Sequence, residues 1–129
     1  MMSEKKILKI LEKYKIKNFK TPIIVEGKND VASLRKLSFE GEIIQVNSGN
    51  SLLDFSETLG RSYKEVIILT DFDRKGVELK HRIETYLVGS GCTVDSFLWN
   101  SIRKSMPVRT IEELPFATKR IQGASINYS

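Results

Sequence analysis

The chain has 129 residues and a formal net charge of +5, with 40% hydrophobic and 29% charged residues. At roughly 100–200 residues per domain this predicts one globular domain; the composition excludes general disorder, and the apolar runs are too short to span a bilayer. The ends are basic, with seven Lys and two Glu in residues 1–20, while residues 21–100 carry nine Lys or Arg and twelve Asp or Glu. Basic flanks around an acidic centre suit a polyanionic partner, although a lysine-rich terminus that only solvates the protein gives the same pattern.

The first half of the chain alternates between helical and extended patterns. Apolar residues at helical spacing predict a basic amphipathic helix over residues 3–14, capped by Ser3. The β-branched run at 23–25 lacks alternation, which indicates a strand buried on both faces. A helix over 29–37, a strand at 43–46, a polar turn at 47–51 and a helix from Leu52 are expected to follow.

The second half repeats this alternation. Residues 66–69 form the clearest buried strand, followed by a loop at 70–76, a helix ending near Gly89 and a fourth strand at 94–99. Thr110 and Glu113 have capping-box spacing, so a last helix is expected there, shortened or kinked by Pro115. Alternating strands and helices predict an α/β fold with a parallel sheet of about four strands. We expect an N-terminal helix in 1–20, an α/β core in 21–100 and a C-terminal helical extension in 101–129.

Acidic residues follow two of the predicted strands. Glu26 ends the first strand, and Asp71 and Asp73 follow the third. Ligands gather at the carboxyl ends of parallel strands, and clustered carboxylates suit Mg²⁺ or Mn²⁺. A single cysteine, Cys92, and a single histidine, His81, exclude a metal centre built from several such side chains, and the cysteine usage makes a reducing, cytoplasmic setting the default.

Each of these acids also has a simpler explanation. An Asp after a strand often only caps the next helix or forms a turn. Glu26 is harder to explain in this way because Glu is a poor cap, and an acid beside a buried run needs a partner such as Lys28 or a metal. Gly27 would allow a sharp turn or a close approach to a ligand. The spacing of glycines and lysines fits neither a P-loop nor a dinucleotide-binding fingerprint.

Two segments together resemble the Toprim domain. They are IIVEGKND at residues 23–30 and TDFDRKG at 70–76, with a glycine-containing turn at Gly49 between them. The Toprim domain is shared by topoisomerases, bacterial-type primases, certain nucleases, recombination mediators and the maturase of 5S ribosomal RNA. The short chain, Lys28 and the segment IEEL at 111–114 most resemble small stand-alone archaeal Toprim proteins related to that maturase. Phe72 replaces the proline often found between the two aspartates.

The resemblance implies a role for each matching residue. Glu26 corresponds to an acid–base and metal-contacting glutamate, Asp71 and Asp73 to metal ligands, and Asp30 to a further metal-site acid of related nucleases. Gly27 and Gly76 correspond to positions that shape the backbone. The chain has no room for the tyrosine-bearing domains of a topoisomerase or the additional domains of a primase.

Four further residues are candidates for contacting a substrate. Lys28 and Arg74 lie beside the carboxylates in the sequence and can orient a phosphodiester. Gly49 and Asn50 can offer backbone N–H groups to a phosphate, or can form an ordinary turn.

We therefore expect a Mg²⁺- or Mn²⁺-dependent enzyme that cleaves phosphodiesters in RNA or DNA, acting in RNA processing or DNA repair. A non-catalytic, Mg²⁺-dependent nucleic-acid-binding subunit of a larger processing complex is the main alternative. A receiver-like signalling domain with Asp71 as its phosphoacceptor is a third hypothesis, weakened because Gly-Lys and not a second acid follows Glu26. The expected partner is nucleic acid, with a protein partner in such a complex, and no membrane.

Overall fold

The computed structural model describes residues 4–46, 49 and 51–127, with side chains through residue 123. Its described strands form one four-stranded sheet in the order β2-β1-β3-β4, in which every neighbouring pair is parallel. The strands are β1 (Ile23–Val25), β2 (Ile43–Gln45), β3 (Glu65–Ile68) and β4 (Thr93–Asp95). This confirms the predicted α/β fold with a four-stranded parallel sheet.

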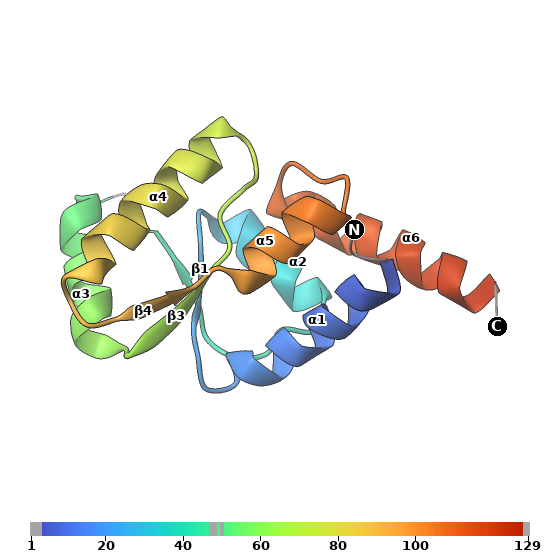
Figure 1. Cartoon of the computed structure of the whole chain (residues 1–129), viewed down its shortest axis with the longest axis horizontal. Helices are drawn as coiled ribbons and strands as arrows, with labels where there is room; N and C mark the ends of the chain where they lie inside the picture. The colour runs from blue at the N-terminus through green and yellow to red at the C-terminus, as the bar shows by residue number, and fades with distance from the viewer. Residues whose placement is uncertain (1–3, 47–48, 50, 128–129) are drawn as a thin grey trace.

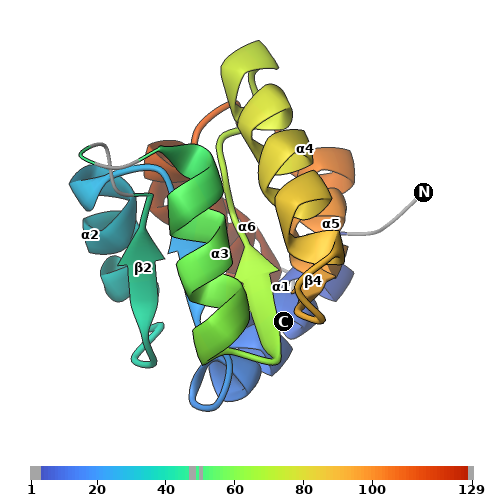
Figure 2. The ribbon, with the colours of Figure 1, turned by 90° about the vertical axis from the view of Figure 1, so that its left-hand side faces the viewer.

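Helices cover both faces of this sheet (Figure 1). One face is covered by α3 (Leu52–Ser62) and α4 (Arg74–Val88), which lie in front of the strands in Figure 2. The other face is covered by α1 (Glu4–Asn18), α2 (Lys28–Lys36), α5 (Phe97–Ser105) and α6 (Leu114–Asn127), with a short 3₁₀ turn, η1 (Ile111–Glu113), leading into α6. The two terminal helices therefore share the core of the sheet and do not stand apart from it.

The central strands supply side chains to both layers. Ile23 and Val25 pack among the helices of the α1 face, while Ile24 packs against α3 and α4. All three are fully buried, which explains why the run is apolar at every position and not alternating. Burying each such side chain contributes roughly 1.5–3 kcal/mol, so β1 and β3 hold their following loops in place.

The chain order of the strands creates a switch point between β1 and β3. From β1 the chain goes through α2 to β2 on one side, and then through α3 to β3 on the other side of β1. Connections leave in opposite directions from these two central strands, which opens a crevice at their carboxyl ends, where α/β proteins bind ligands. Glu26 and Asp71 follow these two strands.

The fourth strand is shorter than predicted. It ends at Asp95, and residues 97–99 belong to α5, because the Phe97 N–H donates to the Asp95 carboxylate (2.9 Å) and turns the chain. Within α5, Trp99 is buried in the core, whereas Phe97 is half exposed.

Pro115 does not interrupt the last helix, α6, which continues to Asn127. It lies in the first turn of α6, where a proline removes no helical hydrogen bond. The predicted cap Ser3 lies outside the described residues. None of the helices in the described part of the chain is long and apolar enough to cross a membrane.

Candidate functional site

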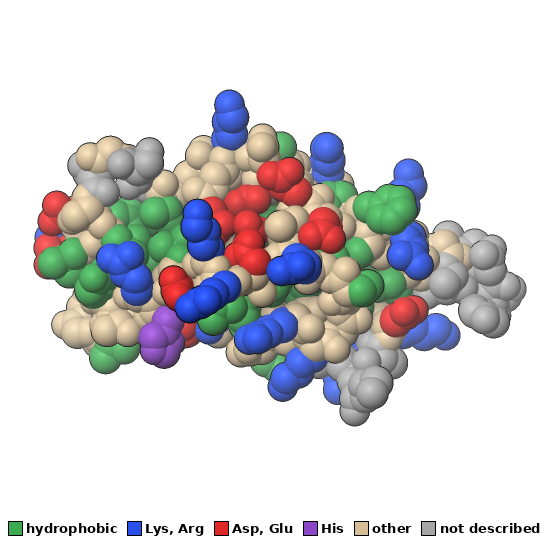
Figure 3. Space-filling model, turned by 90° about the horizontal axis from the view of Figure 1, so that it is seen from above, with side chains coloured by type: hydrophobic (Ala, Val, Ile, Leu, Met, Phe, Trp, Pro, Cys, Tyr) green, Lys and Arg blue, Asp and Glu red, His purple; other side chains and the backbone are tan. Residues whose placement is uncertain are grey.

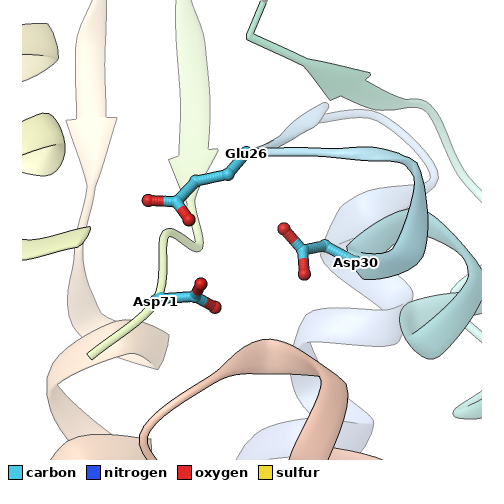
Figure 4. A group of neighbouring side chains, drawn as sticks. All are labelled: Glu26, Asp30 and Asp71. Atoms are coloured by element: carbon cyan, nitrogen blue, oxygen red, sulfur yellow. The ribbon is translucent and has the colours of Figure 1, made fainter. Parts of the chain in front are cut away.

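Three carboxylates converge at the crevice (Figure 4). Glu26 follows β1, Asp30 lies in the first turn of α2, and Asp71 follows β3. One oxygen from each lies within 4.8 Å of the others. This spacing allows a single cation to contact all three, as the carboxyl-end location predicts.

Glu26 and Asp71 form a closely interacting acid pair. Burial raises the pKa of Glu26 to about 8, with further contributions from a hydrogen bond to Asp71 and from the charges of Asp71, Asp30 and Asp73. Glu26 therefore carries a proton at neutral pH when no cation is bound. Like charges this close cannot all ionise at low cost, so the site favours either a shared proton or a cation.

Asp30 is the most buried member of the group, with 5% of its surface exposed. Its Oδ2 accepts a hydrogen bond from the Gly27 N–H (3.1 Å), which ties the first turn of α2 to the end of β1. Burial and the neighbouring Asp71 raise the pKa of Asp30, and Glu112 adds to the shift. Asp30 thus has a structural partner on one oxygen while it faces the other acids.

Gly27 does not provide the expected sharp turn. Its backbone is extended (φ −152°), a conformation that any residue adopts, and a Cβ there would meet nothing within 4 Å.

The backbone around Asp71 is held from two sides. Asp71 Oδ1 accepts a hydrogen bond from the Ile111 N–H (2.8 Å) at the start of η1, and the Phe72 N–H donates to the Arg109 carbonyl (2.8 Å). Gly76 fits directly against the Asp71 carbonyl oxygen, which a Cβ would approach to 2.0 Å. Gly76 is therefore needed for a close approach, as the resemblance implied.

Asp73 plays a different local role. It caps α4, because its Oδ1 accepts a hydrogen bond from the Gly76 N–H (2.8 Å). It is outside the three-carboxylate group but lines the same open pocket of about 480 Å³ as Glu26 and Asp71. Asp73 is therefore a helix cap, the simpler of the two explanations for an Asp after a strand. That it also binds a metal stays a prediction.

The basic side chains near this acidic centre differ in how close they lie to the pocket. Figure 3 shows acidic side chains at the middle of this face with lysines and arginines around them. Lys75 lines the pocket, whereas Arg74 extends into solvent and pairs with Glu78 at 3.7 Å. Lys28 is exposed at the start of α2, and Gly49 is exposed in its turn. Asn50, with Asn47 and Ser48, lies outside the described residues.

Sequence reasoning missed the role of the segment before α6. Glu113 Oε1 accepts hydrogen bonds from the N–H groups of Arg109 and Thr110 and from the Thr110 hydroxyl, each at 3.1 Å. This capping arrangement orients the Ile111 N–H that holds Asp71, and it brings Glu112 toward Asp30. The capping-box spacing was visible in the sequence, but nothing in it pointed to Asp71, 40 positions away.

The donor set fits a hard divalent cation. It consists of carboxylate oxygens, with no His or Cys ligand in the three-residue group. The raised pKa values of Glu26 and Asp30 show that the ionised carboxylates repel one another here, and a cation would relieve this repulsion. The group is compatible with Mg²⁺ or Mn²⁺ and does not by itself select between them.

Comparisons with known proteins identify the family of the chain. Residues 21–95 match the Toprim domain. The chain is 57% identical to a UPF0292 protein of Thermoplasma volcanium over 86% of this chain and 93% of that one, and 38% identical to one of Methanocaldococcus jannaschii over 90% and 93%. A solved structure of an Aquifex aeolicus protein superposes with a TM-score of 0.72 at 29% identity, covering 82% of this chain and 95% of that one.

The chain belongs to the Toprim-domain family, and it shares the UPF0292 family with the archaeal relatives that it matches. This confirms the resemblance to small stand-alone archaeal Toprim proteins. The relationship to the maturase of 5S ribosomal RNA stays a prediction.

Proposed function

We propose that this protein is a Mg²⁺-dependent nuclease that cleaves phosphodiester bonds in RNA or DNA. The observation that carries the proposal is the convergence of Glu26, Asp30 and Asp71 at the switch point of the sheet. Membership of the Toprim family supports a nucleic-acid substrate and a divalent metal. The open pocket of about 480 Å³ beside the carboxylates has room for a phosphodiester.

Each residue has a distinct proposed task. Glu26, Asp30 and Asp71 would hold the cation, and the cation would supply positive charge next to the phosphate. Glu26 also accepts or donates a proton during the reaction, which is the role that the family resemblance gives this residue. The η1 segment fixes Asp71 through the Ile111 N–H, and Lys75 faces the same pocket, where it can contact a phosphate oxygen.

A cleavage assay with Mg²⁺ or Mn²⁺ across single- and double-stranded RNA and DNA tests this function. We expect wild-type turnover, and a loss of about 10²–10⁴ in rate for Glu26→Gln with nucleic-acid binding retained, because an amide cannot exchange a proton. Glu57→Gln, an exposed change on α3, is the matched control.

Other outcomes favour the alternatives. No wild-type turnover across the whole panel, with Mg²⁺-dependent binding retained, would favour the non-catalytic binding subunit. Phosphorylation of Asp71 by a small phosphodonor, without binding or cleavage, would favour the receiver-like domain.

The ligand set can be tested separately by calorimetric titration with Mg²⁺ and Mn²⁺. We expect Asp71→Asn combined with Asp73→Asn to abolish binding. As single changes, Asp30→Asn should weaken binding more than Asp73→Asn, because Asp30 belongs to the converging group and Asp73 already caps α4. Equal binding by the wild type and the double variant would contradict the site. Action in RNA processing or DNA repair, a cytoplasmic setting and a protein partner stay predictions.

A further inference from the structure

A second polar pocket lies where α1, α2 and α6 meet. Its volume is about 480 Å³, and its polar lining comes from Lys15, Lys36, Ser38, Thr118, Lys119 and Gln122. It is separate from the acidic pocket, with which it shares no lining residue. Asp30 lies at the start of α2 and Lys36 at its end, so the two sites are on the order of 10 Å apart along the helix.

Thr118 is the feature that marks this pocket as a binding site. Only 4% of its surface is exposed, and its Oγ1 has no hydrogen-bond partner among the described residues. A threonine in a helix can usually satisfy its hydroxyl on the carbonyl one turn earlier, and a buried hydroxyl left unpaired is costly. Thr118 lines this pocket, but its Oγ1 is shielded from solvent, so a rotation of the side chain is needed to bring the hydroxyl to a ligand oxygen that accepts its hydrogen bond.

The charge around Thr118 is positive. Lys36 and Lys119 are exposed and form no ion pair within the described part of the chain, whereas Lys15 is paired with Glu12 at 2.7 Å. The C-terminal end of α2 contributes partial negative charge. Its Leu34 and Arg35 carbonyl groups are already hydrogen-bonded to backbone N–H groups, which reduces the negative charge that they present to the pocket.

Ser38 adds a second hydroxyl in an uncommon conformation. It has φ 71°, at the position after α2 where glycine is usual. Because this residue is a serine and not a glycine, it adds a hydroxyl group to the lining of the same pocket. Two ammonium groups and two hydroxyl groups can donate hydrogen bonds to the oxygens of a tetrahedral oxyanion.

We propose that this pocket binds a phosphoryl group. Lys36 and Lys119 supply the charge, and Thr118 and Ser38 donate hydrogen bonds to the phosphoryl oxygens. The group belongs either to the backbone of a nucleic acid that also reaches the acidic site, or to a separate small phosphorylated molecule. The chemistry of the pocket is the same in both cases.

Titration with inorganic phosphate, followed by NMR of the Ser38 amide and the Thr118 methyl group, tests the proposal. The titration is done in EDTA, so that no cation occupies the acidic site. We expect saturable shifts that weaken at least fivefold in Thr118→Val and at least tenfold in Lys36→Gln/Lys119→Gln. The matched control Lys64→Gln/Lys104→Gln makes the same charge change at exposed positions outside the pocket and should alter affinity less than twofold.

Two checks separate this site from folding and from the acidic centre. Thr118→Val should unfold at the same or a higher temperature, because it removes an unpaired buried hydroxyl. Asp71→Asn should leave phosphate affinity unchanged, so failure here and failure of the proposed nuclease function are distinguishable. Shifts that do not saturate, or that weaken equally in the control variant, would overturn the proposal.

A single-stranded oligonucleotide then identifies the source of the phosphate. If the nucleic-acid backbone is the ligand, the pocket variant should lower the slope of log affinity against log salt by about 0.7, because the contact to one phosphate is lost. An unchanged slope, together with lost phosphate affinity, identifies a small phosphorylated molecule.

Discussion

Glu26 is the residue whose chemistry depends most on its neighbours. Burial and Asp71 together raise its pKa to about 8, although the side chain is only partly enclosed. An ordinary surface glutamate is ionised above about pH 4.5, so only this environment keeps a proton available near neutrality. The same proton must leave when a cation binds, which links metal affinity to pH.

Without metal, the protein should become less stable as pH rises from about 5 to about 8. In this interval the folded state holds a proton on Glu26 that the unfolded state has released, so the free energy of unfolding falls with pH. The fall should be on the order of 1–2 kcal/mol, because solvent reaches part of the site. Chemical denaturation in EDTA at several pH values measures it. Glu26→Gln should flatten the profile while Glu57→Gln leaves it unchanged; a steep profile in Glu26→Gln would contradict the assignment.

Gly76 is the residue whose lack of a side chain matters most. We expect Gly76→Ala to lower the free energy of unfolding by about 1–3 kcal/mol, since its Cβ would overlap the Asp71 carbonyl oxygen. Divalent-metal affinity should fall with it, because the Asp71 backbone must shift. Gly27→Ala is the control, since a Cβ there meets no atom within 4 Å and the backbone is extended. Thermal unfolding that shows equal stability for both variants would refute this packing argument.

At the scale of elements, η1 and the start of α6 complete a site that the strands only begin. β1 and β3 place Glu26 and Asp71, and α2 places Asp30. The Ile111 N–H then restrains one oxygen of Asp71, and Glu113 restrains the backbone that carries Ile111. Residues 109–113 lie beyond the Toprim match at 21–95, so a segment outside that match contributes to the geometry of the site.

Loss of the Glu113 cap should therefore affect metal binding as well as stability. We expect Glu113→Ala to cost about 1 kcal/mol, as for other helix caps, and to weaken Mn²⁺ binding about tenfold, as loss of an outer-shell partner does. Ser51→Ala is the matched control. Ser51 caps α3 through the Asp54 N–H (3.0 Å), so its loss should cost similar stability but leave Mn²⁺ binding intact. Calorimetric titration that shows equal metal affinity in both variants would mean that η1 does not position Asp71.

At the scale of the whole molecule, acidic and basic side chains lie in different places. The acidic centre lies at the carboxyl end of the sheet, and residues 1–20 carry seven lysines. Sheet topology explains the acidic centre, because only β1 and β3 flank the switch point. Within this segment Lys17 pairs with Glu65 and Asp95, whereas the exposed lysines of α1 suit nonspecific attraction of a polyanion.

Affinity for nucleic acid should fall steeply with salt, and α1 should account for part of that dependence. Replacing Lys5, Lys6, Lys9 and Lys13 by Gln should lower the slope of log affinity against log salt by up to about 3 for a single strand, at roughly 0.7 per contact. Fluorescence anisotropy with a labelled oligonucleotide at several salt concentrations gives the slope. A slope equal to that of the wild type would show that α1 faces away from the ligand.

Local patterns in the sequence were sufficient for the strands, most helices and the two acidic loops. Buried β-branched runs specify β1 and β3, because a strand enclosed on both faces has no polar alternation, and the parallel arrangement then brings Glu26 and Asp71 to one edge. The pattern failed at residues 96–99, where an apolar run reads equally as strand or helix. There the Asp95 carboxylate accepts a hydrogen bond from the Phe97 N–H, which turns the chain from β4 into α5.

Only the tertiary structure decided which carboxylates meet. Asp71 and Asp73 are equivalent in the sequence, but Gly76 takes Asp73 as a helix cap while Asp71 faces Glu26 and Asp30. The contact between Ile111 and Asp71 and the pocket around Thr118 likewise join segments far apart in the chain. Periodicity and spacing describe neighbours along the chain, whereas these contacts depend on how helices pack across the sheet.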